Sequence, residues 1–191
     1  MNEKLKEMKK MLILQDIKKS SEKSGKFGEG IAKEWLKETW EIIDVSSQDK
    51  LFFSQDKLKK NDAKRPDFIS IFDDDDKNEK IILWDAKFHT IENNTFKLKD
   101  DELEKYRNLK KLFCKEIGCD VNNIHIIFII FPKSNDGKKM YLVDLVQFCK
   151  DGKSSFVGND IATEIILNDI NSYDTSLIQK DELEKLLSRN K

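Results

Sequence analysis

The sequence predicts a single α/β domain, because segments of helical period and segments of strand period occur together in one chain of 191 residues. Apolar side chains recur with helical spacing over residues 25–40 and 101–117. Residues 67–72 and 80–87 are short apolar segments of strand length, which we interpret as the two arms of a hairpin. Residues 124–131 form a continuous apolar run, typical of a central strand that is covered on both faces.

The first part of the chain predicts two helices. The first, over residues 2–23, is highly charged, and its apolar patch at residues 11–14 is too small for a signal peptide. The second, over residues 25–40, is amphipathic, with a predicted buried stripe of Phe27, Ile31, Ala32, Trp35, Leu36, Thr39 and Trp40. Glu29 falls at the edge of this stripe in projection, so we expect its carboxylate to point toward the covered sheet. An edge glutamate that reaches for water is the alternative.

The predicted hairpin places two carboxylates opposite each other. If Phe72 pairs with Lys80, Asp67 lies across from Asp85, with Cβ atoms about 5 Å apart. Like charges in this position repel unless a cation lies between them, and Mg²⁺ prefers one or two carboxylates together with waters and phosphate oxygens. A slip of one residue would separate the pair. The alternative is a hairpin whose polar ends reach solvent.

Lys87 shares a strand face with Asp85, one step further along the strand. A lysine at this position can orient or deprotonate an attacking water, or offset the charge that develops on a phosphorane. Two carboxylates and one amine at this spacing therefore predict a metal-dependent phosphodiesterase.

The later segments predict further elements in the order helix, strand, strand. Asp101 and Glu104 have the spacing of a capping box headed by aspartate, which would open the helix that ends near Ile117. After the apolar run, residues 140–148 predict another strand that follows a turn at residues 135–137. Helices are expected near residues 159–169 and 179–188.

The three short motifs Gly28-Glu29-x-x-Ala32, Pro66-Asp67 and Asp85-Ala86-Lys87 together resemble the PD-(D/E)XK nuclease superfamily. This superfamily includes many restriction endonucleases, archaeal-type Holliday junction resolvases and several repair nucleases. The resemblance covers roughly residues 25–131. It implies a restriction-endonuclease-like core of helix, three-stranded meander, helix and further strand. With the later strand added, we expect a central mixed β-sheet of about five strands flanked by helices, with an extra N-terminal helix.

The resemblance also implies a role for each motif residue. Asp67 and Asp85 would bind the metal, the Ala86 carbonyl would be a further ligand, and Lys87 would be the catalytic lysine. Glu29 would be the helix-borne acid that helps to hold the metal or its water. Position 85 carries aspartate where glutamate is commoner in the superfamily, which alters the reach to the metal. The implied cofactor is Mg²⁺, with Mn²⁺ as a substitute.

Some members of the superfamily place a Gln or Lys and a Tyr on the second core helix beside the site. Lys105 and Tyr106 fit this pattern, although Tyr106 also fits the apolar face of the helix, and a place in the core is the alternative.

The charge of the chain is balanced overall but locally basic. The net charge of −1 and the pI of about 6.2 are not those of a protein that coats nucleic acid. Residues 56–65, however, hold five basic side chains against two acidic ones, a local charge of +3 directly before Asp67. The nucleic-acid-binding candidates are Lys57, Lys59, Lys60, Lys64, Arg65 and Lys105. A solvated surface loop is the alternative interpretation.

Composition predicts a protein of a reducing compartment. The cysteines, Cys114, Cys119 and Cys149, have neither zinc-type spacing nor an evident pairing. The longest apolar run, residues 126–131, is far too short to cross a bilayer, so we expect no membrane association and a cytoplasmic location.

These patterns lead to one expected function. We expect one nuclease domain over residues 1–191, with a core at about 25–150, an N-terminal helical extension over 1–24 and a C-terminal helical extension over 151–191. It would be an Mg²⁺-dependent endonuclease that cuts double-stranded DNA, leaves 5′-phosphate products and acts as a homodimer. The helix at residues 2–23 would serve dimerisation or DNA contact.

Three alternatives remain open from the sequence. An RNA endonuclease or an exonuclease would use the same site. A catalytically silent nucleic-acid-binding module would keep the fold without the reaction. A structural or interaction protein would carry the motif by coincidence.

Overall fold

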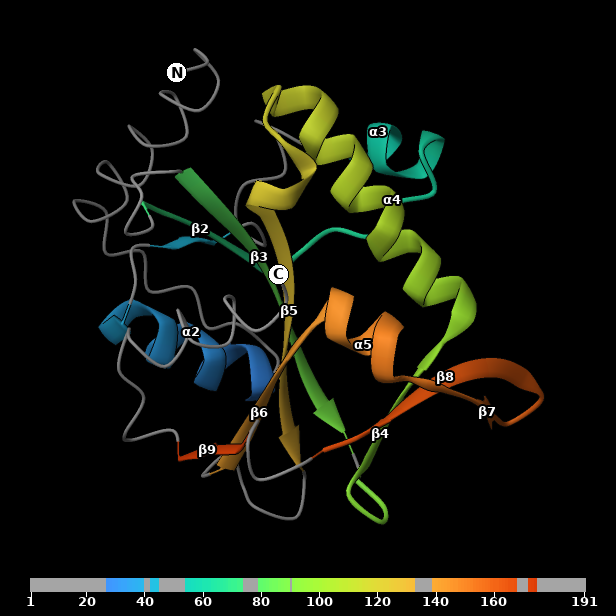
Figure 1. Cartoon of the computed structure of the whole chain (residues 1–191). Coiled ribbons are helices and arrows are strands. Elements are labelled where there is room, and N and C mark those ends of the chain that lie inside the picture. The colour runs from blue at the N-terminus through green and yellow to red at the C-terminus, as the bar shows by residue number, and fades with distance from the viewer. Residues whose placement is uncertain are drawn as a thin grey trace.

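A mixed sheet of six strands forms the centre of the computed structural model, and a second sheet of three strands packs beside it (Figure 1). The mixed sheet confirms an α/β protein with helices against a central sheet, with one strand more than expected. The structure describes residues 27–39, 42–44, 54–73, 79–89, 91–132, 139–167 and 172–174. The helices predicted at 2–23 and 179–188 and the turn predicted at 135–137 lie outside these residues.

The strand β3 (Glu79–His89) lies inside the large sheet between an antiparallel and a parallel neighbour. On one side it pairs with β2 (Phe68–Asp73), which in turn pairs with β1 (Ile42–Asp44). On the other side it runs parallel to β5 (Ile124–Pro132), whose apolar run is buried on both faces as expected. The register pairs Phe72 with Lys80, which confirms the hairpin and has the alignment on which the expected Asp67–Asp85 juxtaposition depends.

The far side of the sheet differs from the prediction at residues 140–148. The strand β6 (Lys139–Asp144) pairs with β5 and with β9 (Ser172–Asp174), and it ends at Asp144. The Asp144 carboxylate accepts a hydrogen bond from the Val146 N–H at 2.6 Å and caps the helix α5 (Leu145–Asp151). The predicted strand therefore continues as a helix from residue 145.

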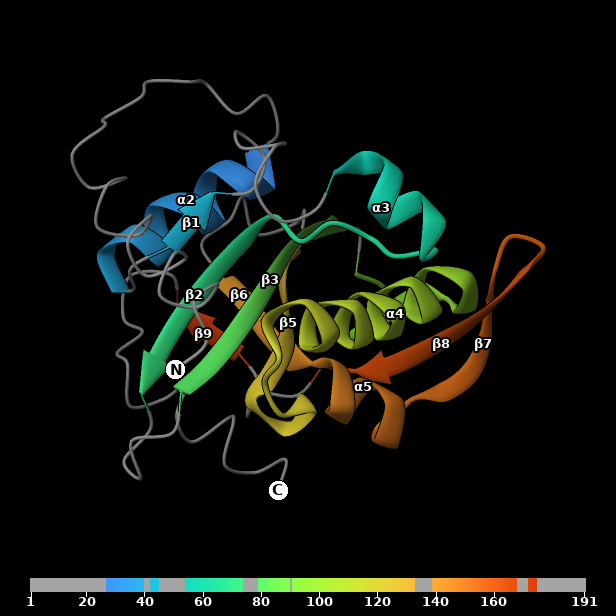
Figure 2. The same cartoon turned by 90° about the horizontal axis from the view of Figure 1, so that it is seen from above.

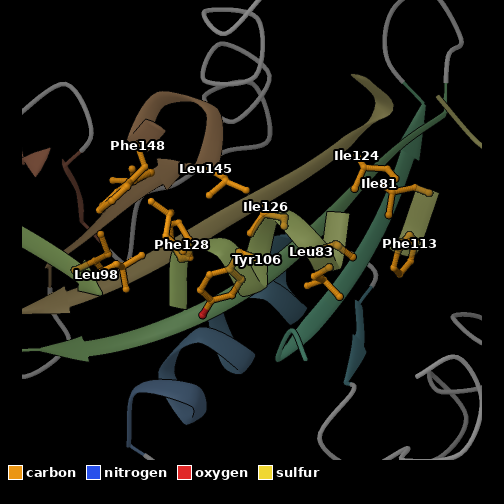
Figure 3. Close-up of a cluster of buried hydrophobic side chains, with 14 of the residues drawn as sticks. Ile81, Leu83, Leu98, Tyr106, Phe113, Ile124, Ile126, Phe128, Leu145 and Phe148 are labelled. Atoms are coloured by element: carbon orange, nitrogen blue, oxygen red, sulfur yellow. The ribbon is translucent and has the colours of Figure 1, made fainter. Parts of the chain in front are cut away.

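Two helices cover opposite faces of the large sheet (Figure 2). Helix α2 (Phe27–Thr39) lies on the face that includes Ile82 and Trp84, where Ala32, Trp35 and Leu36 pack. Helix α4 (Asp100–Ile117) covers the other face, which includes Ile81 and Leu83. Figure 3 shows that second apolar cluster, to which α4 contributes Tyr106 and Phe113. The sheet is therefore the middle layer between two helical layers.

Helix α4 begins two residues earlier than the predicted capping box requires, at Asp100. Its N-cap is Lys99, whose side chain forms no capping hydrogen bond, so the predicted box is wrong. Asp101 lies inside the first turn and pairs with Lys105 at 3.2 Å, while Glu104 pairs with Arg107 at 3.0 Å. Three acids in the first turn complement the positive end of the helix dipole and replace a capping side chain.

The second sheet contains strands where the sequence predicted a helix. Its order is β4 (Thr95–Lys99), β8 (Asp160–Ile166) and β7 (Lys153–Val157), all antiparallel. The predicted helix at 159–169 is wrong because its β-branched residues pair with strands on both sides, after a turn in which Gly158 has a φ of 64°. The described part of the predicted helical extension is thus mainly strand.

The short helix α3 (Gln55–Lys60) lies alongside α4 (Figure 2), and the 3₁₀ turn η1 (Val121–Asn123) precedes β5. No helix within the described part of the chain is long and apolar enough to span a bilayer. Cys114, Cys119 and Cys149 are free thiols.

Candidate active site

The candidate site lies at the end of the β2–β3 hairpin, on the face of the sheet that α4 covers. Because side chains alternate along a strand, Asp85 and Lys87 share the face of Leu83. Asp67 immediately precedes the Phe68–Trp84 pair, and its Oδ2 accepts a hydrogen bond from the Ala86 N–H at 2.8 Å. The structure thus brings Asp67 to the Asp85-Ala86-Lys87 segment.

Asp85 and Lys87 form a buried ion pair. The Lys87 Nζ lies 2.8 Å from Asp85 Oδ1, and only 9% and 4% of the Lys87 and Asp85 side chains are exposed. The same Nζ lies 2.7 Å from Oε1 of Glu102, in the first turn of α4. The lysine therefore bridges a carboxylate of the sheet and a carboxylate of the covering helix.

Glu102 is a site residue that sequence reasoning missed. Its Oε1 accepts hydrogen bonds from Lys64 and Lys87, and the Tyr106 hydroxyl lies 3.5 Å away. In the interpretation of the sequence, the acidic residues around position 102 only mark the start of a helix. The spacing of four residues to Tyr106 was an available signal, because it places both side chains on one face of the helix.

The segment after α3 brings Lys64 to the site. Lys57 pairs with Glu116 near the end of α4 at 2.6 Å, and the Asp62 carbonyl accepts from Asn108 at 3.2 Å. The Lys64 N–H then donates to the Lys105 carbonyl at 3.3 Å, near the beginning of the helix. This segment therefore runs along α4 and ends with the Lys64 side chain inside the charged cluster.

Tyr106 forms the apolar wall behind the charges. Its ring is buried and packs edge-on against Phe128, with ring centroids 4.9 Å apart (Figure 3). The Lys64 and Lys87 ammonium groups lie 5.1 Å and 5.3 Å from its ring centroid. Burial, followed by the charge of Asp85 and a hydrogen bond to it, raises the pKa of the Tyr106 phenol well above its ordinary value. The hydroxyl therefore stays protonated and can donate, while its ring also belongs to the core.

Burial and neighbouring charges act against each other in this cluster. Burial disfavours the Lys87 ammonium, but Asp85 and Glu102 outweigh it and raise the pKa of Lys87. Burial also disfavours the Glu102 carboxylate, but Lys87 and Lys64 outweigh it and lower the pKa of Glu102 to about 2. For Lys64, burial and the adjacent Lys87 charge prevail over the carboxylates and lower its pKa. Lys87 and Glu102 are thus both charged at neutral pH.

The oxygen donors of Asp67, Asp85 and the Ala86 carbonyl fit a hard cation such as Mg²⁺, which needs only one or two protein carboxylates when water and phosphate complete its shell. Among the described residues, no group of three or more His, Cys, Asp and Glu side chains is arranged to hold a metal ion. Asp67 and Asp85, which the hairpin brings to the same end of adjacent strands, are the two carboxylates available for such a site.

The other predicted site residues lie apart from this cluster or at its edge. Glu29 belongs to α2, which covers the opposite face of the sheet, and its side chain is outside the described residues. Lys59 and Lys60 are exposed on α3, whereas Arg65 is half-buried. Lys105 pairs with Asp101 on α4 and does not enter the cluster of Lys64, Lys87 and Glu102.

Comparisons with protein-family models, with curated proteins and with solved structures found no match for this chain. Its function is therefore inferred from the positions and the chemistry of its own side chains.

Proposed function

We propose that this protein is an Mg²⁺-dependent nuclease of the PD-(D/E)XK type that hydrolyses DNA phosphodiester bonds. The observation that carries the proposal is the meeting of Asp67 with Asp85, Ala86 and Lys87 through the Asp67–Ala86 hydrogen bond of 2.8 Å. The elements α2, β1, β2, β3, α4 and β5 follow in this order, with α3 inserted before β2 and β4 before α4, and β5 is parallel to β3. This order supports a restriction-endonuclease-like core around these residues.

Asp67, Asp85 and the Ala86 carbonyl would hold the cation. When bound, Mg²⁺ supplies Lewis-acid polarisation of a phosphate oxygen and acidifies water. Lys87 keeps a positive charge beside Asp85 and Glu102. That charge favours a role in which Lys87 orients the attacking water and offsets phosphorane charge, over a role as the base. Tyr106 excludes water from the inner side of the cluster, because its ring is fully buried against the sheet.

Double-stranded DNA is the proposed substrate, cut to 5′-phosphate and 3′-hydroxyl ends by a homodimer. The exposed lysines of α3, Lys59 and Lys60, lie on the segment that leads to the site and offer contacts for a phosphate backbone. An RNA endonuclease and an exonuclease would use the same carboxylates, so the choice of substrate is an outcome of the test below.

The test is an incubation of the purified chain with supercoiled plasmid, linear duplex, a four-way junction and single-stranded RNA. Each substrate is combined with Mg²⁺, with Mn²⁺ and with EDTA. The proposal expects cleavage that needs the metal and is lost in Asp85→Asn and in Lys87→Ala. Asp151→Asn and Lys150→Ala, both at exposed positions of α5, are the matched controls and should cut normally.

Wild-type cleavage by Asp85→Asn or Lys87→Ala would show that the site is wrongly assigned. Metal-dependent cleavage of RNA alone would keep the site and replace the substrate. An absence of cleavage on all four substrates, with the fold intact, would contradict the nuclease and favour a silent binding module.

A further inference from the structure

Three hydrogen-bond donors from three separate segments converge on a single oxygen atom of Glu102. Lys64 comes from the loop after α3, Lys87 from β3 and Tyr106 from α4. The Lys87 Nζ lies 2.7 Å from Glu102 Oε1 and the Tyr106 hydroxyl oxygen lies 3.5 Å from it, with Lys64 also in direct contact. Two ammonium groups directed at one oxygen, with a phenol hydroxyl 3.5 Å from it, form the donor set of an oxyanion site.

The two lysines require an anion between them. Both ammonium groups contact the same oxygen, Glu102 Oε1, and so they are close neighbours of like charge; both also lie beside the Tyr106 ring, at 5.1 Å and 5.3 Å from its centroid. Two cations held together in a partly buried place repel each other unless an anion separates them. In this structure the Glu102 carboxylate has that function.

Glu102 also lies at the accessible side of the cluster. Its side chain retains 28% exposure, compared with 9% for Lys87 and 4% for Asp85. It belongs to the first turn of a helix, so a rotation of its own side chain is sufficient to remove the carboxylate without moving the sheet. Only Lys64, at 35%, is more exposed. The anion between the lysines is therefore open to exchange with an anion from solvent.

We propose that Lys64, Lys87 and the Tyr106 hydroxyl form a binding site for a phosphate group of the substrate, which Glu102 fills in the resting protein and leaves when the phosphate arrives. This proposal rests on the nuclease function, because the site adjoins Asp85 of the hydrolytic cluster. A non-bridging phosphate oxygen is, like a carboxylate oxygen, a negatively charged acceptor, and it can take the place of Glu102 Oε1. Glu102 then acts as an internal competitor that keeps both lysines oriented toward the site.

The competition predicts that loss of the Glu102 charge strengthens oxyanion binding. Glu102→Ala empties the space between the lysines, and Glu102→Gln keeps the shape of the side chain while it removes the charge. Both variants should bind phosphate at least about tenfold more tightly than the wild type, because a neighbouring carboxylate no longer repels the anion. Lys64→Ala removes one of the two ammonium groups. When it is added to Glu102→Ala or to Glu102→Gln, the gain in phosphate affinity should disappear.

The experiment is a titration of inorganic phosphate into the wild type, Glu102→Ala, Glu102→Gln and the two double variants. It is followed by calorimetry and by the thermal unfolding midpoint, in EDTA, with chloride keeping the ionic strength constant. Glu104→Ala is the matched control, since Glu104 lies on the same helix and pairs with Arg107 and Lys111 instead. The control should bind phosphate as the wild type does.

Equal phosphate affinity in the wild type and in folded Glu102→Gln would overturn the proposal. So would a gain that persists without Lys64, or an equal gain in Glu104→Ala. Because the titration contains neither nucleic acid nor metal, its result is independent of cleavage. Tighter phosphate binding in a protein that never cuts nucleic acid would keep the anion site and refute the nuclease, whereas cleavage without that gain would do the reverse.

Discussion

Two neighbouring residues of β3, Trp84 and Asp85, belong to opposite faces of the same sheet and have opposite surroundings. Trp84 is fully buried against Trp35 of α2, with ring centroids 5.9 Å apart and planes at 87°. Its one polar atom, Nε1, donates to Ser70 Oγ at 2.7 Å. Asp85 is buried as well, but beside the ammonium group of Lys87 and under α4.

The two faces therefore differ in what their burial contributes. On the face of Trp84, apolar area leaves water and the indole N–H of Trp84 has an acceptor, so burial stabilises the fold. On the face of Asp85, charges are removed from water, and their mutual attraction offsets a desolvation cost that apolar residues would not incur. The proposed nuclease site gives a reason for this costly arrangement, because clusters of buried charges are common at active sites.

The largest difference between the two faces should appear when the neighbouring residues Trp84 and Asp85 are each substituted. Trp84→Ala removes the large side chain from the α2 face and should lower the free energy of unfolding by about 3–5 kcal/mol. Asp85→Asn neutralises one of three carboxylates, with Asp67 and Glu102 remaining against Lys64 and Lys87, so the fold should persist while cleavage is lost. Urea unfolding and the plasmid assay measure the two effects. A Trp84→Ala protein as stable as Asp85→Asn would contradict the comparison.

The next largest effect on stability should come from the hydrogen bond between Trp84 Nε1 and Ser70 Oγ. Ser70→Ala leaves the Trp84 Nε1 without its acceptor in a buried place, and should cost about 1–3 kcal/mol of unfolding free energy. Ser154→Ala on β7, an exposed position, is the control and should stay within about 0.5 kcal/mol of the wild type. If both serine variants unfold at the same urea concentration, the Trp84–Ser70 hydrogen bond adds nothing to stability.

The charged face should respond to pH in a defined direction. Because the pKa of Glu102 is lowered to about 2 in the folded state, its stabilisation is complete above its ordinary value of 4.5. That stabilisation disappears as the pH falls from 4.5 toward 2. Glu102→Gln should thus be less stable than the wild type by about 1–2 kcal/mol at pH 7, and the difference should close over that acidic range.

Unfolding of the wild type and Glu102→Gln at a series of pH values measures this difference, with Glu104→Gln as the baseline for the same helix. A gap that stays constant down to pH 2 would mean that the lysines do not stabilise the ionised Glu102.

The smallest effect should come from an ion pair that is exposed to solvent. Lys99 and Asp160 join β4 to β8 with a contact of 2.5 Å, similar in geometry to the buried pair of Lys87. Water and salt screen such a pair, so Asp160→Asn should unfold at the same urea concentration as the wild type. A clear loss of stability in this variant would show that exposure does not separate the two kinds of ion pair.

The sequence by itself determined the hairpin and the side chains that share its faces. Alternation with period two and the position of Asp67 at the start of the first arm are local properties, and the structure has both. The pairing of Phe72 with Lys80 was assumed for the hairpin, and the structure has it as well. The helical period of α4 and the apolar run of β5 were recognisable for the same reason, since each pattern repeats within a few residues.

The sequence pattern could not distinguish a helix from a strand where the segment was short. Residues 145–148 became helical because the Asp144 side chain caps them. Residues 160–166 became a strand because partners on both sides accept and donate their backbone hydrogen bonds. Both outcomes depend on neighbours that a local pattern does not contain.

Only the tertiary structure decided the membership of the charged cluster. Glu102 lies 15 residues from Lys87 and 38 from Lys64, and no spacing rule connects such positions. They meet because α4 packs over the hairpin and the segment after α3 follows α4 back to its beginning. A short-range pattern can assign a side chain to one face of a strand or helix. Contacts between distant elements decide which charged side chains come together in one cluster.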